Sequence, residues 1–240
     1  VIAETAGRVP VIGGASAPAQ AERIATARAM RGLGCAGVLV SIPFESNEQY
    51  RADVCALAEI DPGFLMLQDW DFTGDGLPLD LIVRLFDEVP AFRCLKIETA
   101  QAGGKYSRVL EATGGRLHVS GGWAVTQLIE GLDRGIHAVM PTGLHRAYVN
   151  IIEAHARGDR ESACALFHRL APILMFSNQH LDISIHFFKR LLQAQGIYKT
   201  SRVREPILPF DVHQSRYAAS LILAAIEIEA ELSGTKYVQQ

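Results

Sequence analysis

The stretch that decides the fold reads Phe92-Arg-Cys-Leu-Lys-Ile-Glu-Thr99. It is short and apolar, and a single lysine, Lys96, lies in its middle. Alternation along a β-strand places Leu95 and Ile97 on one face and Cys94, Lys96 and Glu98 on the other. At the edge of an open sheet Lys96 would point into water, whereas in a parallel sheet covered on both faces it would lie in a partly buried interior. Burial disfavours the charged ammonium, and a neutral amine is the nucleophile that condenses with a ketone to form a Schiff base.

Further apolar runs of strand length surround this stretch, and a helical segment separates each from the next. The runs occupy residues 9–13, 36–42, 64–68, 116–120 and 135–140. This βα order predicts a parallel sheet with helices outside it, and the continuous apolar character predicts strands buried on both faces. After residue 143 the pattern changes to helices alone. We therefore expect a βα barrel portion over residues 1–144 and a C-terminal helical region over residues 145–240.

The composition excludes several classes of protein. The 240 residues are 49% hydrophobic and 20% charged, with a formal charge of −3, so no basic surface for nucleic acid is indicated. The longest apolar runs fall short of the roughly 20 residues that span a membrane. The four cysteines lack metal-ligand spacing, and without a signal peptide they favour a reducing cytoplasm. We expect a cytoplasmic globular protein with no metal, no nucleic acid and no membrane partner.

Other candidate sites have simpler interpretations. Asp69, Asp71 and Asp75 suggest a site for a hard cation, but they lack the terminal Glu of a calcium loop, so a solvated loop is favoured. The isolated histidines are interpreted as structural. The glycine pair Gly121-Gly122 is either an anion-binding turn or an ordinary turn. Residues and spacing alone therefore indicate a βα protein with one unusual lysine.

Several motifs, taken in order, extend this picture. They are Arg8-Val-Pro-Val-Ile-Gly-Gly, Gly32-Leu-Gly-Cys-Ala-Gly-Val-Leu-Val-Ser-Ile-Pro, Leu95-Lys-Ile-Glu, Val119-Ser-Gly and residues 135–140. Together they resemble the dihydrodipicolinate synthase / N-acetylneuraminate lyase family of class I Schiff-base lyases. The resemblance implies an α/β fold, a (β/α)8 TIM barrel followed by C-terminal helices. The family's first two strands have no counterpart here, so we expect the chain to be part of a longer polypeptide.

The resemblance also implies a chemistry and a set of site residues. In the family, the lysine that matches Lys96 forms a Schiff base with pyruvate or a 2-keto acid, and no metal or organic cofactor is needed. The positions matching Ser120, Gly121 and Met140 line the keto-acid pocket, and Thr142 and Gly143 lie beside them. The C-terminal helices commonly form subunit contacts, so the resemblance implies a homo-oligomer, a dimer or a homotetramer.

Two departures from the family pattern point to one branch of it. The family's proton-relaying tyrosine aligns with Leu67, and the arginine that holds a second carboxylate in the synthase branch aligns with Phe72. The combination of Gln68-Asp69 with Lys96 to Thr99 looks more like the 2-keto-3-deoxy sugar acid dehydratases and aldolases. Asp69 is expected to approach the lysine as a replacement acid or base; a turn or cap is its alternative role.

Three hypotheses follow from these observations. The first is an aldolase or dehydratase that acts through Lys96 on pyruvate or a 2-keto-3-deoxy sugar acid, with Gln68 among the substrate contacts. In it the Gly121-Gly122 turn holds the carboxylate, and Asp69, Trp70 and Phe44 shape the distal pocket. The second is 4-hydroxy-tetrahydrodipicolinate synthase, which uses pyruvate and aspartate semialdehyde. The third is a catalytically impaired family member that binds a keto acid.

Overall fold

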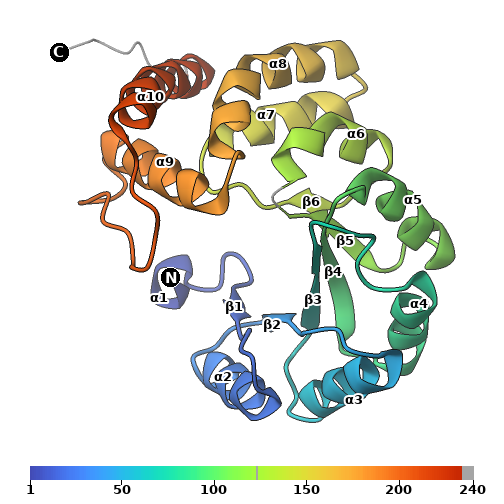
Figure 1. Cartoon of the computed structure of the whole chain (residues 1–240). Helices are drawn as coiled ribbons and strands as arrows, with labels where there is room; N and C mark the ends of the chain where they lie inside the picture. Colours follow the sequence, from blue (N-terminus) through green and yellow to red (C-terminus); the bar gives the residue numbers. More distant parts are fainter. Residues whose placement is uncertain (123, 234–240) are drawn as a thin grey trace. The chain divides into compact units, whose positions relative to one another are not determined.

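The computed structural model describes residues 1–122 and 124–233 (Figure 1). The chain divides into two compact units. The first comprises Val1–Ala124 and Asp133–Val139, and the second comprises Val125–Leu132 and the chain from Met140 onward. Lys96 and the strands on either side of it belong to the first unit.

The first unit is built on a parallel sheet. Its strands are β1 (Ile12–Gly14), β2 (Gly37–Ser41), β3 (Leu65–Asp71), β4 (Phe92–Thr99), β5 (His118–Gly121) and β6 (Ala138–Val139). Within the described part of the chain these six strands pair in sequence order, each parallel to the next. The predicted parallel sheet is confirmed. Because parallel strands end at the same edge of the sheet, the loops after β3, β4 and β5 share one end of the unit.

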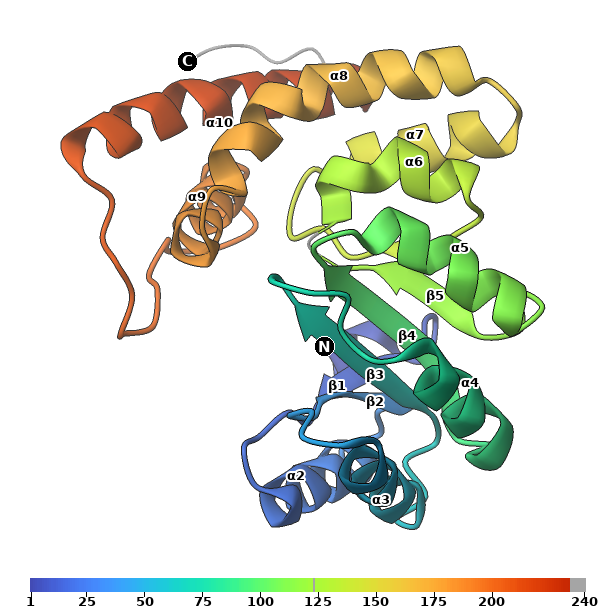
Figure 2. The same ribbon diagram turned by 45° about the vertical axis from the view of Figure 1, so that its right-hand side comes forward.

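Helices cover one face of this sheet, which we call the outer face (Figures 1 and 2). They are α2 (Gln20–Gly32), α3 (Asn47–Ala58), α4 (Leu79–Glu88) and α5 (Ala102–Ala112), preceded by the short α1 (Ile2–Thr5). Local sequence explains their limits. The hydroxyl of Ser46 accepts a hydrogen bond from the Gln49 N–H and caps α3, and Pro78 precedes the first residue of α4.

The core of the first unit lies between these helices and the outer face. Strand residues such as Leu67, Leu95 and Ile97 are fully buried there, against helical residues such as Leu81 and Tyr106. The opposite, inner face carries Lys96 and is only partly covered. The expectation that both faces of the strands are buried is therefore correct for the outer face alone.

The second unit is helical. Between β5 and β6 the chain forms a 3-10 turn, η1 (Ala124–Gln127), and α6 (Leu128–Asp133). After β6 come α7 (His145–Ala156), α8 (Arg160–Ser177), α9 (Leu181–Ala194) and α10 (Val212–Leu232). Helix α7 packs on α8 and α10, and α9 packs on the same two helices. None of the helices in the described ranges is long and apolar enough to cross a membrane.

Candidate active site

Lys96 lies on the inner face of β4. Its neighbours Leu95 and Ile97 point into the core, so alternation directs the lysine to the opposite face. The side chain of Lys96 is 14% exposed, and its Nζ lies 3.1 Å from Oε1 of Glu98, whose side chain is 7% exposed. The prediction that Lys96 occupies a partly buried interior is confirmed. The amine is thus shielded from bulk water without being sealed off.

Glu98 is held in place from the neighbouring strand. Gln68 of β3 lies directly across the ladder from Lys96, and its amide donates a hydrogen bond to Oε2 of Glu98. Gln68, predicted as a substrate contact, therefore joins Lys96 and Glu98 in one cluster. Sequence analysis assigned Glu98 no role. The available signal was its spacing, since residues two apart on a strand share a face.

Strand β5 brings Ser120 to the other side of Lys96. The ladder pairs Lys96 with Ser120 and Ile97 with Gly121. Ser120 is fully buried, and its hydroxyl has no hydrogen-bond partner in the described structure. An unpaired buried hydroxyl costs free energy unless a ligand or water satisfies it, so Ser120 is suited to hold a substrate oxygen.

Gly122 leaves the space that the lysine side chain fills. A Cβ atom at this position would overlap Cε of Lys96 and lie 2.5 Å from Cδ of Glu98. Its N–H donates to the carbonyl of Ile97 at 3.2 Å. Gly122 therefore serves close packing against the pair, and its N–H is already engaged rather than offered to a carboxylate.

Asp69 does not approach Lys96, which corrects the sequence-based expectation. It pairs in the ladder with Ile97 and points to the outer face, where its Oδ2 lies 2.5 Å from Nζ of Lys105 in α5. The two side chains are 1% and 2% exposed. Burial raises the pKa of Asp69, and the hydrogen bond from Lys105 opposes that rise. Asp69 shares a face with Leu67, as predicted, but that face is the one directed away from the lysine.

Leu67, which the resemblance aligns with the family's proton-relaying tyrosine, does not face Lys96. Leu67 is fully buried on the outer face and pairs with Leu95, so its side chain cannot reach the amine. The side chain that faces Lys96 from β3 is that of Gln68. A residue that relays protons to Lys96 from this strand would stand at position 68, where the chain has an amide.

Two aromatic side chains mark the end of β3. Trp70 lies across the ladder from Glu98 and is 57% exposed, and Phe72 follows it at 48% exposed. Their ring centroids are 5.6 Å apart at an interplanar angle of 88°, an edge-to-face arrangement. Phe44, also predicted to shape the distal pocket, follows β2 and lies with its ring centroid 6.1 Å from that of Tyr50.

The carboxylate of Asp71 closes the loop that follows. It accepts hydrogen bonds from the N–H and hydroxyl of Thr73 and from the N–H of Gly74, all at 2.9 Å, and from the N–H of Gly76 at 3.3 Å. These bonds, chiefly the one from the Thr73 N–H, lower the pKa of Asp71. The structure thus uses Asp71 to build a turn. No group of three potential metal ligands occurs in residues 1–122 and 124–233.

The remaining predicted contacts belong to the second unit. Met140, Thr142 and Gly143 follow β6, and a Cβ atom on Gly143 would lie 2.9 Å from the ring of Phe188 in α9. Gly143 therefore allows a close approach between its backbone and that helix. A role of these three residues in substrate binding stays a prediction.

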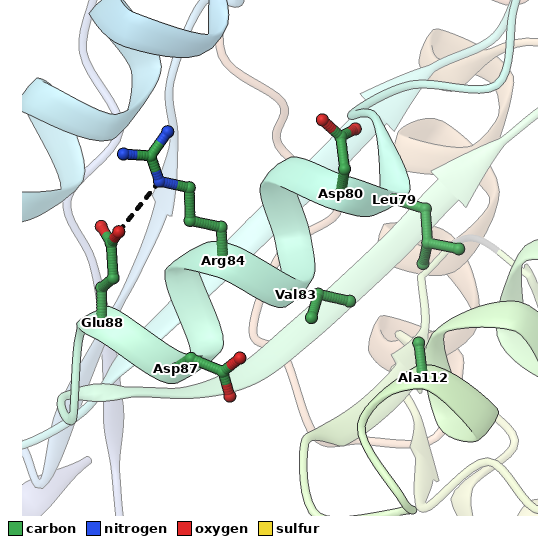
Figure 3. A pocket seen from close by; sticks show the side chains of 7 residues that line it. All are labelled: Leu79, Asp80, Val83, Arg84, Asp87, Glu88 and Ala112. Atoms are coloured by element: carbon green, nitrogen blue, oxygen red, sulfur yellow. Dashed lines mark hydrogen bonds and ion pairs between the residues drawn. The ribbon is translucent and has the colours of Figure 1, made fainter.

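A shallow groove of about 590 Å³ lies apart from this cluster, on the outside of the first unit (Figure 3). Arg84 and Glu88 of α4 form an ion pair at its side, with Nε and Oε1 2.9 Å apart. The lining residues are Leu79, Asp80, Val83, Arg84, Asp87, Glu88 and Ala112. Because they come from the helical layer, the groove is separated from Lys96 by the sheet itself.

A shielded lysine–carboxylate pair on the inner face of a parallel βα sheet is an arrangement in which an amine can act as a nucleophile. The model of the dihydrodipicolinate synthetase family matches residues 1–225, and the chain belongs to that family. The chain is accordingly a carbon–carbon or carbon–oxygen lyase.

Two characterised relatives carry different activities in their names. L-2-keto-3-deoxyarabonate dehydratase of Azospirillum brasilense is 24% identical over 237 residues, covering 93% of this chain and 74% of the relative. The 4-hydroxy-tetrahydrodipicolinate synthase of Methanosphaerula palustris is 27% identical over 221 residues, covering 89% and 74%. The chain thus spans about three quarters of each relative.

Solved structures support the fold. Dihydrodipicolinate synthase from Rhodopseudomonas palustris matches with a TM-score of 0.83 at 22% identity, covering 92% of this chain and 76% of that one. N-acetylneuraminate lyase from Fusobacterium nucleatum matches with a TM-score of 0.78 at 15% identity, covering 96% and 76%. The six strands and their outer helices form a half-barrel like that of these enzymes.

Proposed function

We propose that the chain is a lyase that forms a Schiff base between Lys96 and the keto carbon of pyruvate or a 2-keto-3-deoxy sugar acid. The observation that carries the proposal is the amine of Lys96, 14% exposed, at 3.1 Å from a carboxylate on the same face of the sheet. A nucleophilic amine needs a group that removes its proton and a site that limits water. Glu98 and the inner face supply both.

The proposed first step moves one proton from the Lys96 ammonium to Glu98, which leaves the charge of the pair as a whole unchanged. The free amine then adds to the C2 carbonyl, and Glu98 returns the proton as the C2 oxygen leaves as one water, which gives the positively charged iminium. The iminium draws electrons from C3, so it favours either cleavage of the C3–C4 bond or loss of a C3 proton. Loss of that proton followed by departure of the C4 hydroxyl as water completes a dehydration. Glu98, oriented by Gln68, is placed to carry these protons.

The substrate carboxylate has a candidate donor in the hydroxyl of Ser120. This group is buried, lies next to Lys96 in the ladder, and has no partner in the described structure. A keto acid held through C2 by Lys96 carries its carboxylate on the adjacent atom. One hydrogen bond from Ser120 would orient the keto acid for attack.

A 2-keto-3-deoxy sugar acid is favoured over the substrates of tetrahydrodipicolinate synthesis. Three observations support this choice. The side chain that faces Lys96 from β3 is the amide of Gln68, which does not relay protons as a tyrosine does, and Phe72 replaces the arginine that holds a second carboxylate in the synthase branch. In addition, one relative is named as a 2-keto-3-deoxyarabonate dehydratase. Parallel assays with 2-keto-3-deoxy-L-arabonate and with pyruvate plus aspartate semialdehyde separate the two activities. Faster consumption of aspartate semialdehyde would overturn the substrate assignment.

Borohydride reduction in the presence of pyruvate tests the proposal as a whole. Hydride converts the iminium into a stable secondary amine, and peptide mapping by mass spectrometry locates it. We expect one adduct, on Lys96, in the parent protein and in a Lys199→Arg control, and none in Lys96→Arg. An adduct on another lysine would contradict the proposal. No adduct in a folded protein would also contradict it, and would instead favour a keto-acid-binding protein without turnover.

A further inference from the structure

The segment between β6 and α7 carries three of the predicted keto-acid contacts, Met140, Thr142 and Gly143. Strand β6 ends at Val139 and pairs with β5 in the ladder, so that end of the segment is fixed. Residues 140–144 then lead directly into α7. The conformation of this short connection therefore depends on how the start of α7 is held.

Helix α7 begins without a cap from its own sequence. Leu144, the residue before its first turn, has a left-handed backbone with φ 60° and ψ 35°, and its side chain makes no capping hydrogen bond. The first N–H groups of a helix have no partners inside the helix, and a leucine side chain cannot accept from them. A non-glycine residue at positive φ is also uncommon and persists where its surroundings hold it. The start of α7 therefore depends on groups from elsewhere in the fold.

The missing cap is the carboxylate of Glu229 in α10. Its Oε1 accepts a hydrogen bond from the Ala147 N–H at 2.9 Å, and its Oε2 accepts one from the Arg146 N–H at 3.3 Å. The helix dipole also favours a carboxylate at this end of a helix. Glu229 follows Ala147 by 82 positions in the chain, so a helix distant in sequence holds the start of α7.

Helix α9 packs against the same segment. A Cβ atom on Gly143 would lie 2.9 Å from the ring of Phe188 and 3.3 Å from Cδ2 of Leu191. The side chain of the next residue, Leu144, is buried as well. Contact with α9 and the hydrogen bonds to α10 together restrict the backbone of the segment that carries the predicted substrate contacts.

We propose that Glu229 is a positioning residue for keto-acid binding, because its carboxylate caps α7 and so fixes residues 140–144. The inference rests on the proposed Schiff-base function and adds to it a residue of α10. A binding segment that is already ordered loses less conformational entropy when its ligand binds. Removal of the cap therefore weakens binding of the keto acid, while the groups that carry out the chemistry at Lys96 are untouched.

A titration with pyruvate tests this role. Borohydride trapping on Lys96 is measured per folded protein at increasing pyruvate, which gives the concentration at half saturation and the rate at saturation. In Glu229→Ala we expect the half-saturating concentration to rise about tenfold and the saturated rate to change less than about twofold. An unchanged half-saturating concentration, or a loss confined to the saturated rate, overturns the inference.

Two controls separate positioning from stability. Asp159→Ala removes the cap of α8, in which the Ser162 N–H donates to Oδ1 of Asp159 at 3.1 Å. Glu231→Ala removes an ion pair with Arg169, of 2.7 Å, from the same helix as Glu229. Both variants should keep the half-saturating concentration of the parent, although the loss of the α8 cap should lower the thermal midpoint as the loss of the α7 cap does. An equal rise in either control would make the effect a general loss of stability and overturn the inference.

The conservative variant Glu229→Gln tests the hydrogen bonds themselves. The amide keeps one oxygen that can accept a hydrogen bond from a backbone N–H of α7. We therefore expect a half-saturating concentration within about threefold of the parent, well below that of Glu229→Ala. If the two variants are equally impaired, the hydrogen bonds to α7 do not carry the effect, and the assignment of Glu229 is wrong.

The two proposals fail in different ways. If pyruvate forms no adduct on Lys96 of the parent protein, the Schiff-base function is wrong. If the parent forms the adduct and Glu229→Ala saturates at the same pyruvate concentration as the parent, the function stands and the role of Glu229 is wrong.

Discussion

Two lysine–carboxylate pairs lie on opposite faces of the same sheet and differ in how completely each is enclosed. Lys105 is 2% exposed, contacts Asp69 at 2.5 Å and donates to two carbonyls besides. Lys96 is 14% exposed and has Glu98, at 3.1 Å, as its one partner in the described residues. All the protons of the Lys105 ammonium are engaged, so its nitrogen has no room for a substrate.

The comparison teaches that burial alone does not mark a reactive lysine. Lys105 is the more deeply buried of the two, and its three partners hold its nitrogen in a fixed position. Lys96 has one carboxylate within reach of its proton and an unpaired hydroxyl, that of Ser120, on the neighbouring strand. Incomplete pairing therefore distinguishes a candidate reactive amine better than burial does.

Lys96→Arg is the change with the largest expected effect on the comparison. Arginine keeps the positive charge and can pair with Glu98, but it cannot form the iminium. We expect turnover of a 2-keto-3-deoxy sugar acid to fall by at least about 10⁴-fold, with the thermal midpoint nearly unchanged. Steady-state assays and thermal denaturation measure the two quantities. If turnover survives this substitution, Lys96 is no more reactive than Lys105, and the proposed function loses its basis.

Lys105→Met should instead damage stability. It leaves the buried Asp69 carboxylate without its cation, and we expect a loss of about 3–5 kcal/mol in the free energy of unfolding. Burial already raises the pKa of Asp69 in the folded protein. The folded variant therefore binds that proton more tightly than the unfolded chain does, and its deficit should shrink as the pH is lowered. Urea denaturation across acidic and neutral pH measures this, and a deficit independent of pH would contradict it.

Glu98→Gln tests whether the carboxylate beside Lys96 takes part in catalysis. The amide keeps nearly the same shape but cannot accept the proton of Lys96, so turnover should fall by about 10²-fold. The rate at which pyruvate is trapped by borohydride should fall with it. Asp69→Asn/Lys105→Met removes both charges of the outer-face pair together, and we expect no comparable loss in the trapping rate per folded protein. Equal effects of the two substitutions would show that the faces are not functionally distinct.

The smallest expected effect concerns a histidine pair at the other end of β5. The rings of His118 and His137 stack with centroids 4.8 Å apart, and burial, with a contribution from His137, lowers the pKa of His118 from 6.5. Below that pH the unfolded chain binds the proton more readily, so stability should be full above 6.5 and decline as the pH falls toward the lowered pKa. His118→Gln should flatten this slope in thermal denaturation. If the dependence of the thermal midpoint on pH is unchanged in the variant, groups other than His118 cause the loss of stability at low pH.

The sequence sufficed for the fold and for Lys96 because both depend on local patterns. Apolar runs separated by helical segments predicted each strand of the sheet, and alternation within residues 92–99 placed the lysine on the correct face. The same alternation placed Glu98 on the face of Lys96, which the structure confirms, although no pattern in the sequence indicated a role for Glu98.

Asp69 and Lys105 could not be placed in this way. Whether Asp69 faces Lys96 depends on the register between β3 and β4, and the pairing of Gln68 with Lys96 directs Asp69 to the other face. A lysine in a helix is ordinarily exposed, and the carboxylate that justifies the burial of Lys105 lies 36 positions earlier in the chain. Long-range pairing of this kind leaves no periodic trace in the sequence.

The turn built by Asp71 has a practical consequence for altering this enzyme. Its carboxylate accepts hydrogen bonds from three backbone N–H groups and one hydroxyl within residues 73–76. The backbone of the turn is therefore fixed by Asp71 itself, while Asp75 adds an exposed ion pair with Arg108. Positions 72 and 75 can therefore be randomised in a small library while the backbone between them keeps its conformation. Such a library would recruit new aldehydes or sugar acids by exchanging one or two side chains, with the amine chemistry left untouched.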